Sequence, residues 1–263
     1  CGCGLFRVNE MTQIEALLEF LGEAVTPFHA VAAMARRLSD AGFEEVERFD
    51  AETMTAGRGY FMTRQGSSVI AVRAGQGRPD AGLRLVGAHT DSPNLSVKPN
   101  PVKGCDGCVQ LGVDVYGGAL LNPWFDRDLA IAGRVTLLTT SGELCSTLFD
   151  SVRPVAIVPS LAIHLDREAN KQRSINPQKD VVPLVMLGDP QQFDFKAWLA
   201  ETLTAQDSQW QDARVMDYEL SLYDVQPPAV AGIDESWITS ARLDNLLSCF
   251  AGLSALIDTE DAE

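Results

Sequence analysis

An apolar run of the sequence ends directly at an imidazole and a carboxylate. Residues 85–88 are apolar or glycine, His89 follows, and Asp91 stands two positions further on. In open α/β sheets ligands collect at the carboxyl ends of strands, so a histidine at such an end is well placed to face a site. A carboxylate can fix the tautomer and orientation of a metal-bound imidazole, and Asp91 is close enough in sequence to do this for His89. The alternative is a hydrogen-bonded histidine followed by a turn into Pro93.

A second candidate carboxylate lies near the carboxy-terminal end of the sequence. Asp244 and Asn245 lead into a stretch with strong helical periodicity, so either side chain could cap that helix. A carboxylate at such a junction could instead bridge two cations, because each of its oxygens can bind one ion. Spacing in the sequence does not choose between these two roles.

The six cysteines raise the question of a thiolate metal site. Four of them occur as close pairs that could together bind zinc: Cys1 with Cys3, and Cys105 with Cys108. We do not expect such a site. The first pair lies in a stretch without helical or strand periodicity, and the second lies in a Gly-rich loop where a turn needs no metal. Cys145 and Cys249 stand in apolar stretches and are expected to be small core residues.

Composition limits the class of protein and its partners. The 263 residues are 46% apolar, which is enough for one large domain or two smaller ones with a sizeable core. The 21 basic and 36 acidic residues give a net charge of -15, which repels a nucleic-acid backbone. No apolar run approaches the roughly 18 residues that span a bilayer, and no basic-then-apolar segment opens the chain. We therefore expect a cytoplasmic protein with reduced thiols and with neither a nucleic-acid nor a membrane partner.

Two amphipathic helices are predicted near the amino-terminal end. Apolar residues recur at helical spacing over residues 14–21 and again over residues 31–38. Thr26 and Pro27 are a typical start for the second helix, and Gly42 is a typical stop. Strands are predicted next at residues 60–63, 68–74 and 83–88. The last has too little polar alternation for a solvated face, so we expect it to be central in its sheet.

The middle of the chain changes character. Short strands are predicted at residues 109–115, 133–139, 144–149, 155–158 and 215–222, broken by Gly and Pro, with a weak helix at 193–205. These strands indicate a mostly antiparallel segment. Strong helical periodicity returns after Gly232, with apolar residues at four-, three- and four-residue steps from Leu246. The simplest organisation is a β-rich insertion within an α/β domain.

Several motifs resemble, in this order, the aspartyl aminopeptidase family. They are HTDSPNLSVKP at residues 89–99, YGGAL at 116–120, WFDRD at 124–128, LAIHL at 161–165 and ARLDNL at 241–246. The likeness extends to TPFHA at 26–30 and YELSLYD at 218–224, so it covers nearly everything from about residue 13 to residue 257. Members of the family are dinuclear-zinc exopeptidases that remove an amino-terminal residue, often acidic, from peptides, and they assemble into tetrahedral dodecamers.

The resemblance implies a fold and a domain organisation. It implies a zinc-exopeptidase-like α/β catalytic domain interrupted by a β-rich oligomerisation domain. On this basis residues 11–93 are expected to form the first part of the catalytic domain, 94–232 the insertion, and 233–263 the second, incomplete part of the catalytic domain.

The resemblance also implies roles for individual residues. His89 is expected to be a zinc ligand, Asp91 to assist catalysis by orienting it, and Asp244 to bridge two zinc ions. His164 is expected to be a zinc ligand or a group that contacts the substrate. The active site that it reaches could be its own or that of a neighbouring subunit. Imidazole and carboxylate ligands suit manganese or cobalt as well as zinc.

Two further residues of these motifs are expected to be structural. The apolar stripe beside His29 favours a buried, hydrogen-bonded imidazole there. Arg127 stands between two acids, which favours an ion pair or an oligomer contact over a catalytic role.

The mechanism that the resemblance implies is metal-assisted hydrolysis, with a glutamate as the proton acceptor. In the family a Glu-Glu pair follows the carboxy-terminal helix, whereas this sequence ends at Glu263, a few residues past the predicted helix and without such a pair there. The chain is therefore expected to be an amino-terminal fragment with little activity by itself and with an unpaired sheet edge. The alternative is a non-catalytic oligomerisation or regulatory subunit derived from such an enzyme.

Overall fold

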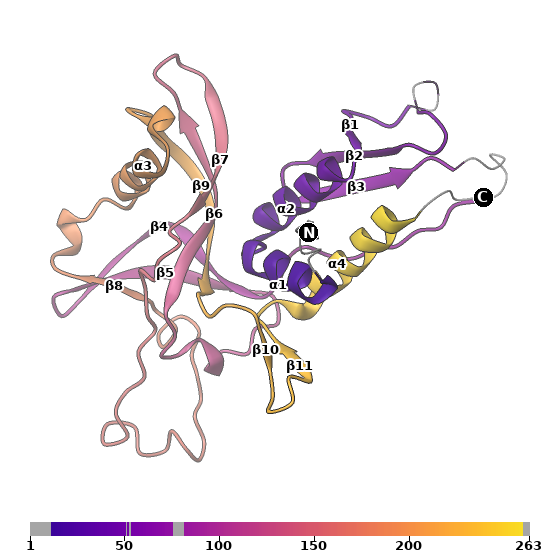
Figure 1. Cartoon of the computed structure of the whole chain (residues 1–263). Coiled ribbons are helices and arrows are strands. Elements are labelled where there is room, and N and C mark those ends of the chain that lie inside the picture. Colours follow the sequence, from indigo (N-terminus) through magenta and orange to yellow (C-terminus); the bar gives the residue numbers. More distant parts are fainter. Residues whose placement is uncertain (1–11, 51, 53, 76–81, 260–263) are drawn as a thin grey trace, which may run out of the picture. The chain divides into compact units, whose positions relative to one another are not determined.

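The computed structural model describes residues 12–50, 52, 54–75 and 82–259. The chain divides into two compact units (Figure 1). Unit 1 comprises the residues up to Thr90 and those from Pro227 onwards, and unit 2 comprises Asp91–Gln226. The predicted fold class, an α/β domain interrupted by a β-rich segment, is confirmed. Within the described residues, no helix is long and apolar enough to cross a membrane.

The described part of unit 1 contains three helices: α1 (Gln13–Glu23), α2 (Pro27–Asp40) and α4 (Leu243–Asp258). The two predicted amino-terminal helices are confirmed. The Thr12 backbone N–H donates to Glu15 (2.7 Å), and the Glu15 N–H donates to the Thr12 hydroxyl (3.2 Å), which closes a capping box at the start of α1. At α2 the Thr26 hydroxyl and Pro27 occupy the predicted cap and first position. Gly42, with φ +81°, follows the end of that helix.

A small sheet completes the amino-terminal part of unit 1. It consists of β1 (Glu44–Glu45), β2 (Gly59–Arg64) and β3 (Ser68–Arg73). β1 runs parallel to β2, and β2 and β3 form an antiparallel hairpin. The helix α2 packs on β2 and β3 and also contacts α1 and α4. Phe20, Leu21, Leu38, Phe61 and Leu246 lie fully buried at this contact, so the apolar stripes of the helices form one core with the sheet.

Two short strands, β10 (Ala229–Ala231) and β11 (Trp237–Thr239), form an antiparallel hairpin that precedes α4. The predicted carboxy-terminal helix is confirmed as α4. Its predicted apolar stripe begins at Leu246, and the next two members, Phe250 and Leu253, are also buried.

The prediction of a central strand at residues 83–88 is wrong. These residues are extended but pair with no described strand, and Leu83 and Leu85 are 87% and 86% exposed. The apolar composition of a segment shows that its side chains favour burial, but a strand also needs a neighbouring strand for its backbone hydrogen bonds. No described segment supplies one here.

Unit 2 is built on a six-stranded antiparallel sheet in the order β7-β6-β9-β4-β5-β8. The strands are β4 (Asn94–Cys105), β5 (Cys108–Tyr116), β6 (Leu129–Leu138), β7 (Leu144–Asp150), β8 (Leu184–Leu187) and β9 (Arg214–Asp224). The predicted antiparallel character is confirmed. The predicted strand at 155–158 forms only isolated bridges, to residues that include Leu129 and Leu184. Pro154 and Pro159 flank the segment and have no N–H group with which to extend the pairing.

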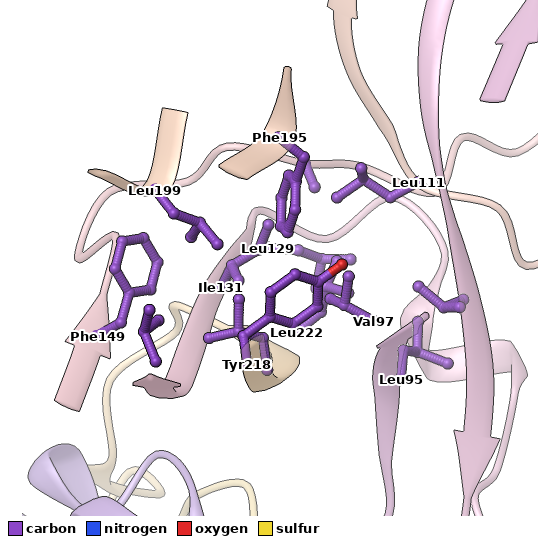
Figure 2. Packing of buried hydrophobic residues seen from close by; sticks show 14 of the residues in the cluster. Leu95, Val97, Leu111, Leu129, Ile131, Phe149, Phe195, Leu199, Tyr218 and Leu222 are labelled. Carbon is purple, nitrogen blue, oxygen red and sulfur yellow. The ribbon is translucent and has the colours of Figure 1, made fainter. Parts of the chain in front are cut away.

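The helix α3 (Phe195–Gln206) covers one face of this sheet. Figure 2 shows Phe195 and Leu199 of the helix directed at sheet residues that include Leu129 and Tyr218. The rings of Phe195 and Tyr218 meet edge to face at 5.4 Å. The Tyr218 hydroxyl donates to the Lys98 carbonyl oxygen (2.8 Å), and burial raises the pKa of Tyr218 to about 12. Unit 2 therefore has its own hydrophobic core.

The closest backbone approach in the unit 2 sheet predicts a sharp loss of stability. Gly133 of β6 has φ +155°, and a Cβ atom there would lie 2.0 Å from the Glu219 carbonyl oxygen of β9. We expect Gly133→Ala to lower the free energy of unfolding of unit 2 by about 3 kcal/mol, because two paired strands would have to separate. Urea denaturation followed by tryptophan fluorescence measures this.

Gly142 supplies the matched control. It also has a positive φ, +86°, but apart from its two chain neighbours no atom lies within 4 Å of the position that a Cβ atom would take there. Gly142→Ala should therefore lower the free energy of unfolding by only about 1 kcal/mol, the cost of placing alanine in a left-handed backbone conformation. Equal losses for the two variants would show that the steric contact with β9 is not what requires glycine at 133.

Candidate metal centre

The side chains of His89 and Asp244 meet in unit 1. The His89 Nε2 atom lies 3.4 Å from Asp244 Oδ1, although the two residues are far apart in the sequence. The side chains are 54% and 91% exposed, so a cation can reach both donor atoms from solvent. The predicted convergence of these two residues is confirmed.

The separation of the two donor atoms suits a shared zinc ion. Two ligand atoms bound at about 2.1 Å to one tetrahedral zinc ion are themselves about 3.4 Å apart. The measured distance between His89 Nε2 and Asp244 Oδ1 is 3.4 Å. Imidazole nitrogen and carboxylate oxygen are both zinc ligands. Among the described residues no cluster of three or more His, Cys, Asp or Glu side chains could hold a metal, and the roles of His89 and Asp244 as zinc ligands remain predictions.

The start of α4 positions Asp244. Asp244 (φ -86°, ψ 107°) and Asn245 (φ -120°, ψ 16°) do not have helical dihedral angles, and the peptide bond between them is cis. The regular helix begins after them, and the Leu246 N–H donates to the Arg242 carbonyl oxygen (3.2 Å). Asp244 therefore stands in front of the regular helix, where its carboxylate reaches His89.

Arg242 anchors this segment to another helix. Its Nε donates to the Ala24 carbonyl oxygen (3.2 Å) and its Nη2 to the Leu21 carbonyl oxygen (3.3 Å). Both acceptors lie at the carboxy-terminal end of α1, where carbonyl groups lack helical partners and a cation is favoured. Arg242 itself has φ +62°, a left-handed conformation that non-glycine residues seldom adopt. The two hydrogen bonds help to hold the backbone in this conformation.

The main chain at His89 is held from both sides. The His89 N–H donates to Asn245 Oδ1 (3.3 Å), and the Cys249 thiol donates to the His89 carbonyl oxygen (3.2 Å). The neighbouring Thr90 hydroxyl donates to the Ser67 carbonyl oxygen (2.9 Å). Burial raises the pKa of the Cys249 thiol, so this group remains a protonated donor at neutral pH.

Asp91 belongs to unit 2 and is held there by Tyr116. The Tyr116 hydroxyl donates to Asp91 Oδ2 (2.8 Å), and this hydrogen bond to the carboxylate raises the pKa of Tyr116. One carboxylate oxygen of Asp91 thus has a fixed partner. The orienting role of Asp91 toward His89 remains a prediction.

His164 lies in an exposed turn of unit 2, in the long connection between β7 and β8. It belongs to a different unit from His89 and Asp244, and its role as a ligand or substrate contact remains a prediction. His29 is half-buried rather than buried, and its Nδ1 shares a hydrogen bond with the Thr26 hydroxyl (2.8 Å), in line with a structural role.

The other candidates have structural explanations. Arg127 pairs with Asp224 (3.5 Å) and donates to Gln226 (2.8 Å), so the predicted ion pair is confirmed. Cys108 has a free thiol. The first pair of the four-thiolate set, at positions 1 and 3, lies outside the described residues.

Three residues that position this site, Arg242, Asn245 and Cys249, carry no signal of that role in the sequence. Arg242 belongs to the same short motif as Asp244 but was given no role, and Asn245 was considered only as a helix cap. Cys249 was expected to be a small core residue, and its hydrogen bond to His89 was not foreseen. No local pattern of the sequence signals these contacts, because they depend on how α4 lies against the segment that contains His89.

Comparison with known proteins gives consistent matches. Residues 20–263 match the family described as aminopeptidase I zinc metalloprotease (M18). A probable M18 family aminopeptidase 2 of Ectopseudomonas mendocina is 52% identical over 254 residues, which are 95% of this chain and 58% of that protein. Its counterpart in Pseudomonas aeruginosa (strain UCBPP-PA14) is 49% identical over 251 residues, with the same two shares.

Solved structures of related proteins also match this chain. The chain matches one from the cryo-EM structure of the Ape4 and Nbr1 complex with a TM-score of 0.86 and 33% identity, covering 93% of this chain and 50% of that one. For Chaetomium thermophilum mApe1 the TM-score is 0.84 with 31% identity, covering 94% and 58%. This chain spans a little over half the length of the curated relatives that it matches. The predicted resemblance is confirmed, because a family model matching nearly the whole sequence shows that the chain belongs to the aminopeptidase I zinc metalloprotease (M18) family.

Proposed function

We propose that this chain carries part of the metal centre of a zinc-dependent aminopeptidase, with His89 and Asp244 as ligands of a common zinc ion. The observation that supports this proposal is the 3.4 Å separation of His89 Nε2 and Asp244 Oδ1 on two exposed side chains. Membership of a family of zinc metalloproteases supports the choice of zinc. The same donor atoms would also accept manganese or cobalt.

Each residue has a proposed part in this centre. Asp244 turns one oxygen toward His89, and its other oxygen is proposed to bind a second zinc ion. Asp91 is proposed to orient the His89 imidazole. The hydrogen bond from the Tyr116 hydroxyl to one carboxylate oxygen of Asp91 supports this role because it fixes the carboxylate. His164 is proposed to contact zinc or substrate. Zinc bound at this centre would polarise a scissile carbonyl group and lower the pKa of a water molecule.

The proposed reaction is hydrolysis of the peptide bond that follows an amino-terminal residue. The relatives from Ectopseudomonas and Pseudomonas are named as probable aminopeptidases, which supports this reaction class. The hypothesis of a non-catalytic subunit is not favoured, because the relatives that match 95% of this chain are named as probable aminopeptidases. The family resemblance implies substrates whose amino-terminal residue is often acidic.

Removal of either proposed ligand should weaken zinc binding. We expect His89→Gln and Asp244→Asn each to lower the zinc affinity of the chain by about 100-fold, at the upper end of the roughly 10–100-fold that loss of an outer partner costs. Competition with a chromophoric chelator measures the affinity. His29→Gln is the matched control, since His29 is already hydrogen-bonded to Thr26. Unchanged affinity in both ligand variants would rule out this pair as the zinc site.

Activity should depend on the same metal. In the full-length protein, removal of zinc by a chelator should abolish release of amino-terminal residues from peptides that begin with Asp or Leu, and added zinc should restore it. Asp244→Asn should lower kcat/KM by at least about 100-fold at saturating zinc, because it removes a charged ligand. Full activity of the metal-free protein would contradict the proposed reaction.

We also propose that the chain forms homo-oligomers through unit 2. Its sheet ends in two edge strands, β7 and β8, which carry the exposed apolar side chains Leu144 and Leu187. Exposed apolar side chains on unpaired edges favour association with another chain. Light scattering should therefore give a mass above that of a single chain, and Leu187→Lys should shift the distribution toward the monomer. A monomeric wild-type chain at micromolar concentration would contradict this proposal.

A further inference from the structure

The main chain at His89 lacks the support that a sheet would give it. Residues 83–90 pair with no described strand, so their backbone has no ladder to fix its direction. At His89 both main-chain polar groups are nevertheless bonded to side chains of unit 1. Asn245 Oδ1 accepts from the N–H at 3.3 Å, and the Cys249 thiol donates to the carbonyl oxygen at 3.2 Å. Side chains of α4 therefore act here as a neighbouring strand would.

One face of α4 contacts the segment at Val86 and at His89. Cys249 and Gly252 are three residues apart and so lie on the same side of the helix. A Cβ atom on Gly252 would lie 3.0 Å from Val86 Cγ1, so the absence of a side chain there lets the segment approach α4 closely. Val86 meets the helix at Gly252, and His89 meets it at Cys249. The segment thus runs along α4 toward Asp244.

We infer that Asn245 and Cys249 are positioning residues for His89, which hold its main chain so that the imidazole faces Asp244. This inference rests on the proposed metal-binding function. The side chains of His89 and Asp244 are 54% and 91% exposed, so packing around them cannot fix their geometry. The position of the His89 main chain, fixed by its hydrogen bonds to Asn245 and Cys249, therefore helps to set where the imidazole lies.

The arrangement links the two proposed ligands through one structural element. Asp244 is the immediate neighbour of Asn245, so the same turn of chain supplies one ligand and anchors the other. A shift of α4 would move both donor atoms together and preserve their separation. Loss of either anchor would free the His89 main chain while leaving Asp244 in place.

Conservative and non-conservative variants at position 249 test the inference. Serine and alanine are both smaller than cysteine and leave similar space, but only serine retains a donor for the His89 carbonyl oxygen. We expect Cys249→Ala to lower the zinc affinity by about tenfold, and Cys249→Ser to stay within about twofold of wild type. Asn245→Ala, which removes the other anchor, should give a loss similar to that of Cys249→Ala.

Cys145 offers a matched control in unit 2. Its thiol also faces a main-chain carbonyl oxygen, that of Leu137, at 3.9 Å. Cys145→Ala should leave the zinc affinity unchanged.

Amide hydrogen exchange of the metal-free chain gives a second readout that does not depend on zinc. Loss of the Asn245 acceptor should speed exchange of the His89 amide by about tenfold or more, while amides of β2 and β3 keep their wild-type rates. Acceleration throughout unit 1 would show a general structural role and overturn the inference. Equal zinc affinities for the alanine, serine and wild-type proteins, with unchanged His89 exchange, would also overturn it. If the wild-type chain binds no zinc but the selective change in His89 exchange is observed, the proposed function fails while the positioning role stands.

Discussion

The contact between the His89 imidazole and the Asp244 carboxylate is the constraint on which the functional interpretation of unit 1 depends. It joins an extended segment without a strand partner to the beginning of α4, and it leaves both donor atoms accessible to solvent. An acidic and a basic group brought together on an exposed surface gain little stability from their attraction alone. Their separation of 3.4 Å is instead suited to a shared cation. The hydrogen bonds of Arg242 and Asn245 hold the two segments that carry these donor atoms.

The core of unit 1 provides the rigid support for this contact. The helices α1, α2 and α4 bury their apolar stripes against one another and against β2 and β3. Arg242 donates hydrogen bonds to carbonyl groups at the carboxy-terminal end of α1, and the Cys249 thiol donates one to the His89 carbonyl oxygen. The elements that form the core are therefore the same elements that place the proposed ligands. Unit 2 has a separate core under α3, so the residues of the β-rich insertion can fold around their own sheet.

Much of this structure could be predicted from local sequence signals. Thr26 and Pro27 mark the start of α2 because capping and a fixed φ are local properties, and the apolar spacing after Leu246 marks α4 for the same reason. Pairing between strands is not local, and the errors in the predicted strands arise from it. Residues 83–88 are apolar enough for a central strand but have no described partner. β4 was missed because it contains Pro99 and Pro101, which fall where its pairing with β5 shifts register.

The candidate site was predictable in part. Spacing alone could not show that His89 and Asp244 meet, since they lie on segments far apart in the sequence. The order of the motifs supplied that expectation, and the structure confirms the contact. The anchoring by Asn245 and Cys249 depends on how α4 lies against the extended segment, which no periodicity reports.

An anomalous difference map at the zinc absorption edge, from crystals of the chain grown with zinc, tests the central claim most directly. The predicted result is a peak about 2.1 Å from both His89 Nε2 and Asp244 Oδ1. Zinc bound at cysteine, His29 or His164 with no peak between His89 and Asp244 would contradict it.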